Sequence, residues 1–295
     1  MTVSTTPILD LVRSNFNFEV NKYPLTGPDN IHTPLYGLFR SDTFDLVGSA
    51  SVTSRYVPHT VDDVLALVES TETAFEGCEA KCLFSDGHYV TIAPSDSHRV
   101  SIYGTNDNVF PRITISAGFD GKAFKVMAGY FRDACSNLAM MRSVRSTTVK
   151  VNHNGGLRDR LDELKTQFAG LKDGWGDLVD SINNLQAVDV NLADFLRDVY
   201  GEPTAETGRE VTIHQNRTET IFDRVMKERA KTGRPSFQYG QPKMVSAWEA
   251  YNAVQGYVQH KATRKGSPSD YQRVIAASSD KAVLKAETLA FQLAG

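Results

Sequence analysis

Apolar and polar residues alternate over most of the first half of the chain, a two-residue period typical of strands with one buried face. Turn-forming clusters separate these segments, and Asp120-Gly121 between two alternating runs predicts a hairpin. The predicted strands are Phe16–Tyr23, Leu35–Arg40, Leu46–Val57, Ala80–Phe84, Tyr89–Ala93, Arg112–Ala117, Ala123–Ala128 and Val144–Val151.

Two short helices are predicted among these strands. The apolar spacing of residues Pro7–Asn15 fits a brief helix, and Thr60 is placed to cap a second one. Because apolar side chains at i, i+3, i+4 and i+7 share one helical face, the second helix should pack on the sheet. Its apolar positions are Val61, Val64, Leu65 and Val68.

From Gly156 onward the apolar period lengthens to that of an amphipathic helix. Strands followed by helices, without βαβ alternation, predict the α+β class. We expect a β-rich lobe with two short helices over residues 1–153 and a helical lobe over residues 154–295, packed together as one unit. The longer predicted helices are Arg209–Lys231, Lys243–His260 and Lys281–Leu293, preceded by apolar faces at Leu157–Phe168 and Leu192–Val199.

Composition places the chain among ordinary globular proteins, with 41% hydrophobic and 23% charged residues. The sequence has neither an apolar run of membrane-spanning length nor the pattern of a secretory leader, so we expect a cytoplasmic protein without membrane contact. Three cysteines are an odd and sparse set, which fits a reducing compartment better than a disulfide framework.

The net charge of −3 conceals two segments of opposite sign. Residues 61–120 carry ten acids against three bases, whereas residues 122–158 carry seven bases against the single acid Asp133. A basic band is a weak signal for anion binding, and solvated charges on opposite strand faces explain it equally well.

Most sequence motifs of enzymes and metal sites are absent from this chain. The chain contains no phosphate-binding glycine loop with its lysine and hydroxyl residue, no GxGxxG, no GxSxG and no HExxH. Cys78, Cys82 and His88 resemble part of a zinc site, which would need His59 or His98 to complete it. Ordinary strand cysteines are the favoured interpretation, so we predict no cofactor and no metal.

A metal-dependent nuclease is harder to dismiss. Glu79-Ala80-Lys81 has the Glu-x-Lys form in which a carboxylate binds Mg²⁺ and a lysine steadies the attacking water. Such tripeptides arise often by chance, and a cross-strand charge pair is the simpler explanation. Second carboxylate ligands would have to come from Asp62, Asp63 or Glu69.

Seven blocks, taken as an ordered set, resemble those of phage/plasmid-like proteins that carry the domain of unknown function 932. The resemblance runs from about Phe16 to His260 and implies a role in phage, plasmid or prophage replication regions, without an established reaction. The blocks are Phe18–Leu25, Gly48–His59, Phe119-Asp120-Gly121, Tyr130-Phe131-Arg132, Cys135-Ser136-Asn137, Val151–Gly155 and Ala247–His260.

These observations lead to one functional hypothesis: a non-catalytic protein of replication or recombination that binds or anneals single-stranded nucleic acid and forms a homo-oligomer. Single-strand binders combine cations that follow the phosphates with aromatic rings that stack on bases. His153 is included because an anion could bind near a helix N-terminus there. The predicted contact residues are Lys122, Lys125, Tyr130, Arg132, Arg142, Arg145, Lys150 and His153.

Three alternatives remain open at this stage. Tyr130 and Arg132 could brace the corner that leads into Cys135-Ser136-Asn137 instead of touching nucleic acid, and His153 could be a turn residue. The chain could be the Mg²⁺-dependent nuclease centred on Glu79 and Lys81. It could also act on a host protein by direct protein contact.

Overall fold

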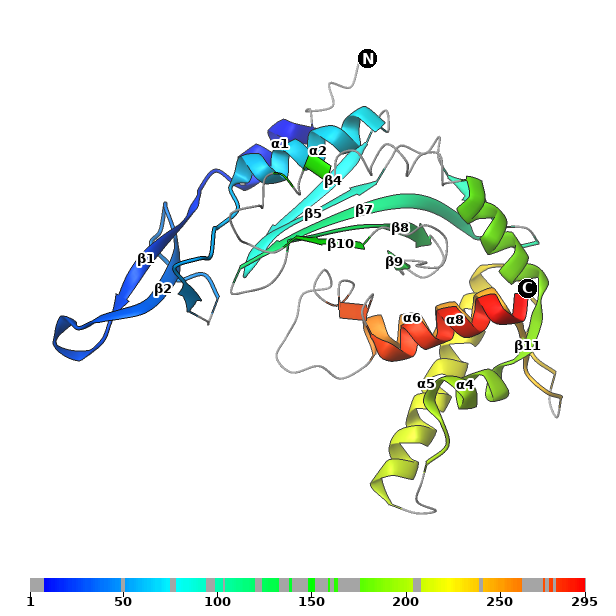
Figure 1. Ribbon diagram of the computed structural model, residues 1–295. Helices are drawn as coiled ribbons and strands as arrows, with labels where there is room; N and C mark the ends of the chain where they lie inside the picture. The colour runs from blue at the N-terminus through cyan, green and yellow to red at the C-terminus, as the bar shows by residue number, and fades with distance from the viewer. Residues whose placement is uncertain are drawn as a thin grey trace. The chain divides into compact units, whose positions relative to one another are not determined.

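The computed structural model of the chain divides into two compact units (Figure 1). Unit 1 comprises Met1–His98, Pro111–Ala128 and Thr147–Asp173, and unit 2 comprises Arg99–Phe110, Gly129–Ser146 and Gly174–Gly295. Segments 99–110 and 129–146, which the sequence analysis put in the β-rich lobe, thus belong to unit 2. The structure describes residues 8–48, 51–74, 78–93, 99–102, 104–119, 124–132, 138–139, 148–151, 159, 162–163, 176–203, 208–238, 241–261, 273, 276–277 and 280–294.

The main sheet has the strand order β10-β8-β7-β5-β4. Its β4/β5, β5/β7 and β8/β10 pairs are antiparallel, and β6 and β9 pair with β7 and β8. β7 and β8 contribute residues to both units. The predicted Asp120-Gly121 turn connects these neighbouring strands and lies outside the described residues. The strands are β4 (Glu79–Phe84), β5 (Gly87–Ala93), β6 (Val100–Ser101), β7 (Asn108–Gly118), β8 (Phe124–Arg132), β9 (Leu138–Ala139) and β10 (Thr148–Val151).

Helices α1 (Ile8–Asn15) and α2 (Val61–Ala74) cover one face of this sheet in unit 1, as Figure 1 shows. α2 begins where predicted, because Thr60 Oγ1 accepts a hydrogen bond from the Asp63 N–H and the Asp63 carboxylate accepts one from the Thr60 N–H. Every second residue of the strands packs against the apolar faces of these helices. This core contains Val12, Phe16, Val64, Leu67, Val68, Val90, Ile92, Ile113, Ile115, Phe124 and Val126.

A separate three-stranded sheet in unit 1, the arm, has the order β1-β2-β3. It consists of β1 (Val20–Thr26), β2 (His32–Arg40) and β3 (Val52–Thr53), with a 3-10 turn at Pro28–Asn30. The strand predicted over Leu46–Val57 is not continuous: among its described residues, only β3 and a bridge from Leu46 to Phe39 form strand pairing. Gly48, at φ 77°, lies in the left-handed region and breaks the strand between them.

Unit 2 is mainly helical, which together with the sheets confirms the α+β class. Its described helices include α4 (Leu192–Tyr200), α5 (Arg209–Lys231), α6 (Ala247–His260) and α8 (Lys281–Ala294). Two short strands, β11 (Asp189–Asn191) and β12 (Met244–Ser246), pair ahead of α4 and α6 and were not predicted. Three residues are too few to show a two-residue period.

The α6 helix is the centre of the unit 2 core. Ser246 and Glu249 form a capping box at its start, and Trp248, Tyr251 and Val254 are fully buried. The helix predicted over this block is therefore present and packs in the core of unit 2. Asn252 donates to the Trp248 carbonyl at 2.8 Å, which satisfies a backbone group of its own helix.

Gly87, which begins β5, should not tolerate a side chain. A Cβ there would lie 2.6 Å from the Gly118 Cα and closer still to the Ala117 carbonyl oxygen, both of them backbone atoms. We predict that Gly87→Ala lowers the free energy of unfolding by about 1–3 kcal/mol, since neighbouring strands must shift. Urea denaturation measures this. Gly27→Ala is the control, because its Cβ would make only an ordinary contact of 3.7 Å with the Ile31 oxygen; equal effects would contradict the steric argument.

Candidate functional site

Two of the predicted basic contacts meet in the sheet of unit 1. Antiparallel pairing of β8 with β10 places Lys150 directly opposite Lys125. Phe124 and Val126, on either side of Lys125, are buried in the core under α1 and α2. Because successive positions of a strand alternate between faces, the Lys125 and Lys150 positions lie on the sheet face away from those helices.

Lys125 is half-buried. The pair is the part of the predicted basic band that the structure brings together.

Four of the predicted contacts lie outside the described residues: Lys122, Arg142, Arg145 and His153. In sequence they flank the two lysine positions. Lys122 precedes β8 by two residues, and Arg142 and Arg145 precede β10.

Tyr130 and Arg132 are not at the surface, which corrects their assignment as nucleic-acid contacts. Tyr130 is fully buried, and its ring packs on Trp248 with centroids 5.1 Å apart. Arg132 is 2% exposed and forms ion pairs with Asp107 and with Glu228, the latter at 3.0 Å. A buried ring offers no face to a base, so both residues belong to the core of unit 2. The corner at Cys135-Ser136-Asn137, which they were alternatively expected to brace, lies outside the described residues.

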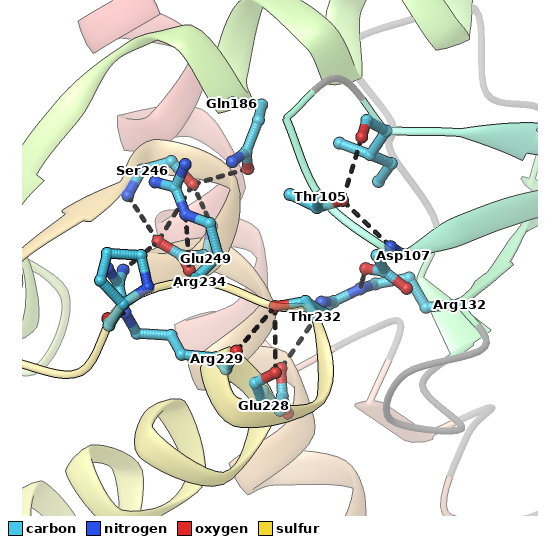
Figure 2. A network of polar contacts seen from close by, with 12 residues as sticks. Thr105, Asp107, Arg132, Gln186, Glu228, Arg229, Thr232, Arg234, Ser246 and Glu249 are labelled. Atoms are coloured by element: carbon cyan, nitrogen blue, oxygen red, sulfur yellow. Dashed lines mark hydrogen bonds and ion pairs between the residues drawn. The ribbon is translucent and has the colours of Figure 1, made fainter.

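Figure 2 shows the polar network around Arg132 in unit 2. Glu228 on α5 also pairs with Arg224 at 2.8 Å. A second centre lies at Glu249 on α6, which binds Arg229 at 2.7 Å and lies 3.6 Å from Arg234.

This network fixes the entry to α6 and the end of α5. Ser246 donates to the Gln186 side chain at 2.8 Å, and Arg229 donates to the Pro235 carbonyl at 2.9 Å. The Asn106 N–H donates to the Thr232 carbonyl at 3.0 Å. Its charged groups alternate in sign and pair with one another, so loss of one partner would leave another buried charge less well compensated.

Unit 1 contains a second buried polar feature, a histidine pair. His59 Nε2 and His88 Nδ1 lie 2.8 Å apart, and both residues are almost completely buried. His59 stacks on Phe119 with centroids 4.3 Å apart, and Phe16 meets His88 edge-on at 4.6 Å. Burial, with a smaller effect of Arg40, lowers the pKa of His88 to about 3, so His88 is neutral in the folded protein.

The histidine pair and the cysteines do not form a zinc site among the described residues, where no three His, Cys, Asp or Glu side chains gather. His88 Nδ1 is occupied by His59, and His98 lies outside the described residues. Burial raises the pKa of the Cys82 thiol to about 11, which disfavours the thiolate that zinc requires.

The geometry also separates the carboxylates of the nuclease alternative. Glu79 and Lys81 on β4 are exposed, whereas Ala80 and Cys82 between and after them pack toward the core under α1 and α2. The other carboxylates considered, Asp62, Asp63 and Glu69, belong to α2, which covers that core face. Glu79 therefore points away from the helix that was to supply its partner ligands.

Removal of Arg132 should unfold unit 2 without touching a binding surface. Arg132→Ala removes the ion-pair partner of buried Asp107 and one of the two ion-pair partners of Glu228, so we expect a loss of about 3–5 kcal/mol in the free energy of unfolding. Arg197→Ala is the matched control, because the Arg197–Asp194 pair is about half exposed and worth at most about 1 kcal/mol. Thermal or urea unfolding measures both; equal losses would contradict the buried role of Arg132.

The neutral His88 makes stability depend on pH. In the unfolded chain a histidine binds a proton near pH 6.5, whereas folded His88 stays neutral to about pH 3. The unfolded state then holds more protons between these values, so stability falls as pH drops below about 6.5, by about 2 kcal/mol at pH 5. Urea unfolding at several pH values tests this, with exposed His32→Ala as a control that keeps the dependence. A flat profile would contradict a neutral His88.

Comparisons with known proteins agree with the sequence blocks. Neither curated proteins nor solved structures give a match. A family profile described as "Domain of unknown function (DUF932)" matches residues 49–285, which is more than half of the chain. The protein therefore belongs to the family of the domain of unknown function 932.

Proposed function

We propose that this protein binds single-stranded nucleic acid through the β8–β10 side of the unit 1 sheet, and acts by binding or annealing strands without cutting them. The observation that carries the proposal is the cross-strand pair of Lys125 and Lys150. Lysine residues that neighbouring strands bring to opposite positions are suited to follow a phosphate backbone.

The sequence around this pair strengthens the proposal. Residues 122–158 contain seven bases and one acid, and of these bases Arg132 is neutralised in the unit 2 core. The remaining basic residues include Lys122, Arg142 and Arg145, which flank β8 and β10.

Binding of this kind should depend mainly on phosphates. Tyr130, the aromatic residue assigned to base stacking, is buried and cannot supply a stacking platform. We therefore expect steep salt dependence and little preference among base sequences.

The proposed setting is the cytoplasm, in the replication or recombination of a mobile element. The resemblance to phage/plasmid-like proteins supports that role. The odd and sparse set of three cysteines also fits a reducing compartment. Within the described part of the chain, no helix is long and apolar enough to cross a membrane.

Salt titration tests the proposal directly. Fluorescence anisotropy with a labelled single-stranded oligonucleotide at about 50 and 200 mM salt should show a steep loss of affinity. Lys125→Ala and Lys150→Ala should each lower the salt slope by about 0.7, because each removes one released counterion. Exposed Lys227→Ala on α5 is the control and should leave the slope unchanged. Undetectable binding, or unchanged slopes in both lysine variants, would defeat the proposal.

A charge reversal separates binding from folding. Lys150→Glu reverses the charge at one proposed phosphate contact, so we expect affinity for single strands to fall while the melting temperature holds. A fall in both quantities would mean that Lys150 acts through the fold. The same samples, incubated with plasmid and Mg²⁺ and then with chelator, should show no metal-dependent cleavage.

A further inference from the structure

A buried histidine pair lies where the arm of unit 1 meets the main sheet. His88, on β5, belongs to the main sheet, and His59 lies between β3 of the arm and α2. The facing atoms, His59 Nε2 and His88 Nδ1, are 2.8 Å apart, and the two residues are 1% and 0% exposed. The proposed nucleic-acid binding does not use this pair.

The pair contacts two apolar cores of unit 1. One core lies between the main sheet and the helices α1 and α2, and the other lies under the strands of the arm. The His88 ring centroid is 4.6 Å from that of Phe16 in the first core and 5.7 Å from that of Phe18 in the second. His59 stacks on Phe119, also in the second core, at 4.3 Å. Both histidines therefore take part in the packing of the arm against the main sheet.

Side-chain packing at this seam joins the arm to the main sheet. In the part of the chain that the structure describes, β1, β2 and β3 pair with one another and not with a strand of the main sheet. Phe18, just ahead of β1, meets Phe84 of β4 edge to face with ring centroids 4.6 Å apart. Since the main sheet has its own core under α1 and α2, the seam can open while that core remains folded.

A proton on His88 would place a charge among aromatic rings and near another cation. The Arg40 guanidinium, on β2, lies 3.7 Å from the ring centroid of Phe18 and 5.2 Å from that of Phe84. Both of these rings also contact His88. Burial, with a smaller effect of Arg40, lowers the pKa of His88 to about 3. The closed seam therefore disfavours a charged His88, whereas an open seam would let water solvate the charge.

The surroundings of His88 supply no compensating negative charge among the described residues that act on it. The charge that acts on His88 comes from Arg40, and the titratable group bonded to it is His59. The other neighbours are aromatic rings from the ends of α1, β1, β4 and β7, namely Phe16, Phe18, Phe84 and Phe119.

We propose that the His59–His88 pair is a pH-sensitive latch, which holds the arm on the main sheet while both rings are neutral. Protonation releases the arm before the sheet under α1 and α2 unfolds. One neutral ring can donate its N–H to the other, whereas two protonated rings would face each other with an N–H on both sides of a 2.8 Å gap. The latch is separate from nucleic-acid binding and does not depend on it.

Proton linkage sets the size of the effect. A histidine in water binds a proton near pH 6.5, whereas His88 stays neutral in the closed seam. Opening therefore takes up a proton below about pH 6.5 and becomes more favourable as the pH falls. Between pH 7.5 and pH 5.0, His88 alone should raise the equilibrium constant for opening by about 30-fold.

Hydrogen–deuterium exchange of the full chain at pH 7.5 and 5.0, corrected for intrinsic exchange rates and read by mass spectrometry, tests the latch. Amides of β1 and β2 should exchange faster than those of β7 at both pH values, because the arm opens by itself. Protection of the arm should fall by about 30-fold from pH 7.5 to pH 5.0. β7 should stay protected over the time in which the arm exchanges.

His88→Asn keeps an amide near the position of Nδ1 and does not titrate in this range, so it should remove most of the pH effect on the arm. His32→Ala is the matched control, because His32 is an exposed histidine of β2, and it should keep the effect. Equal protection of the arm and β7 in the wild-type chain, or arm exchange that does not change with pH, would overturn the proposal even if His88→Asn does not fold. An unchanged pH effect in folded His88→Asn would also overturn it.

Discussion

The buried charge of Arg132 is the constraint on which the arrangement of unit 2 depends. A guanidinium that is 2% exposed must be neutralised where it lies, and its two partners, Asp107 and Glu228, come from the start of β7 and from α5. The ion pairs therefore fix the start of β7 and the end of β8 against α5. Tyr130 lies two residues before Arg132 on β8 and packs on Trp248, so α6 also packs against this part of β8.

Unit 1 is held together by apolar contact instead. One face of its sheet packs under α1 and α2. The strand positions that alternate with these core residues lie on the opposite face of the sheet. The positions of Lys125 and Lys150 therefore lie on the face away from the helices. Glu79 and Lys81 on β4 lie on that same face. The histidine pair shows the same preference for neutral groups, since burial keeps His88 uncharged.

The proposed binding of single strands rests on lysine residues that the register of β8 with β10 brings to opposite positions. Cations that follow a phosphate backbone give binding that depends on salt more than on base sequence.

The sequence alone determined the features that depend on near neighbours. Helical spacing and capping residues predicted α2, α5, α6 and α8, and the ordered blocks identified the family, because each of these signals lies within a few residues. Only the tertiary structure decided which basic residues are accessible. From the sequence alone, Arg132 is predicted to be a surface cation, because its ion-pair partners lie 25 and 96 residues away in the chain. The Lys125–Lys150 pair exists only because of the register of β8 with β10. Long-range pairing and burial are set by the packing of the whole unit, which no local pattern encodes.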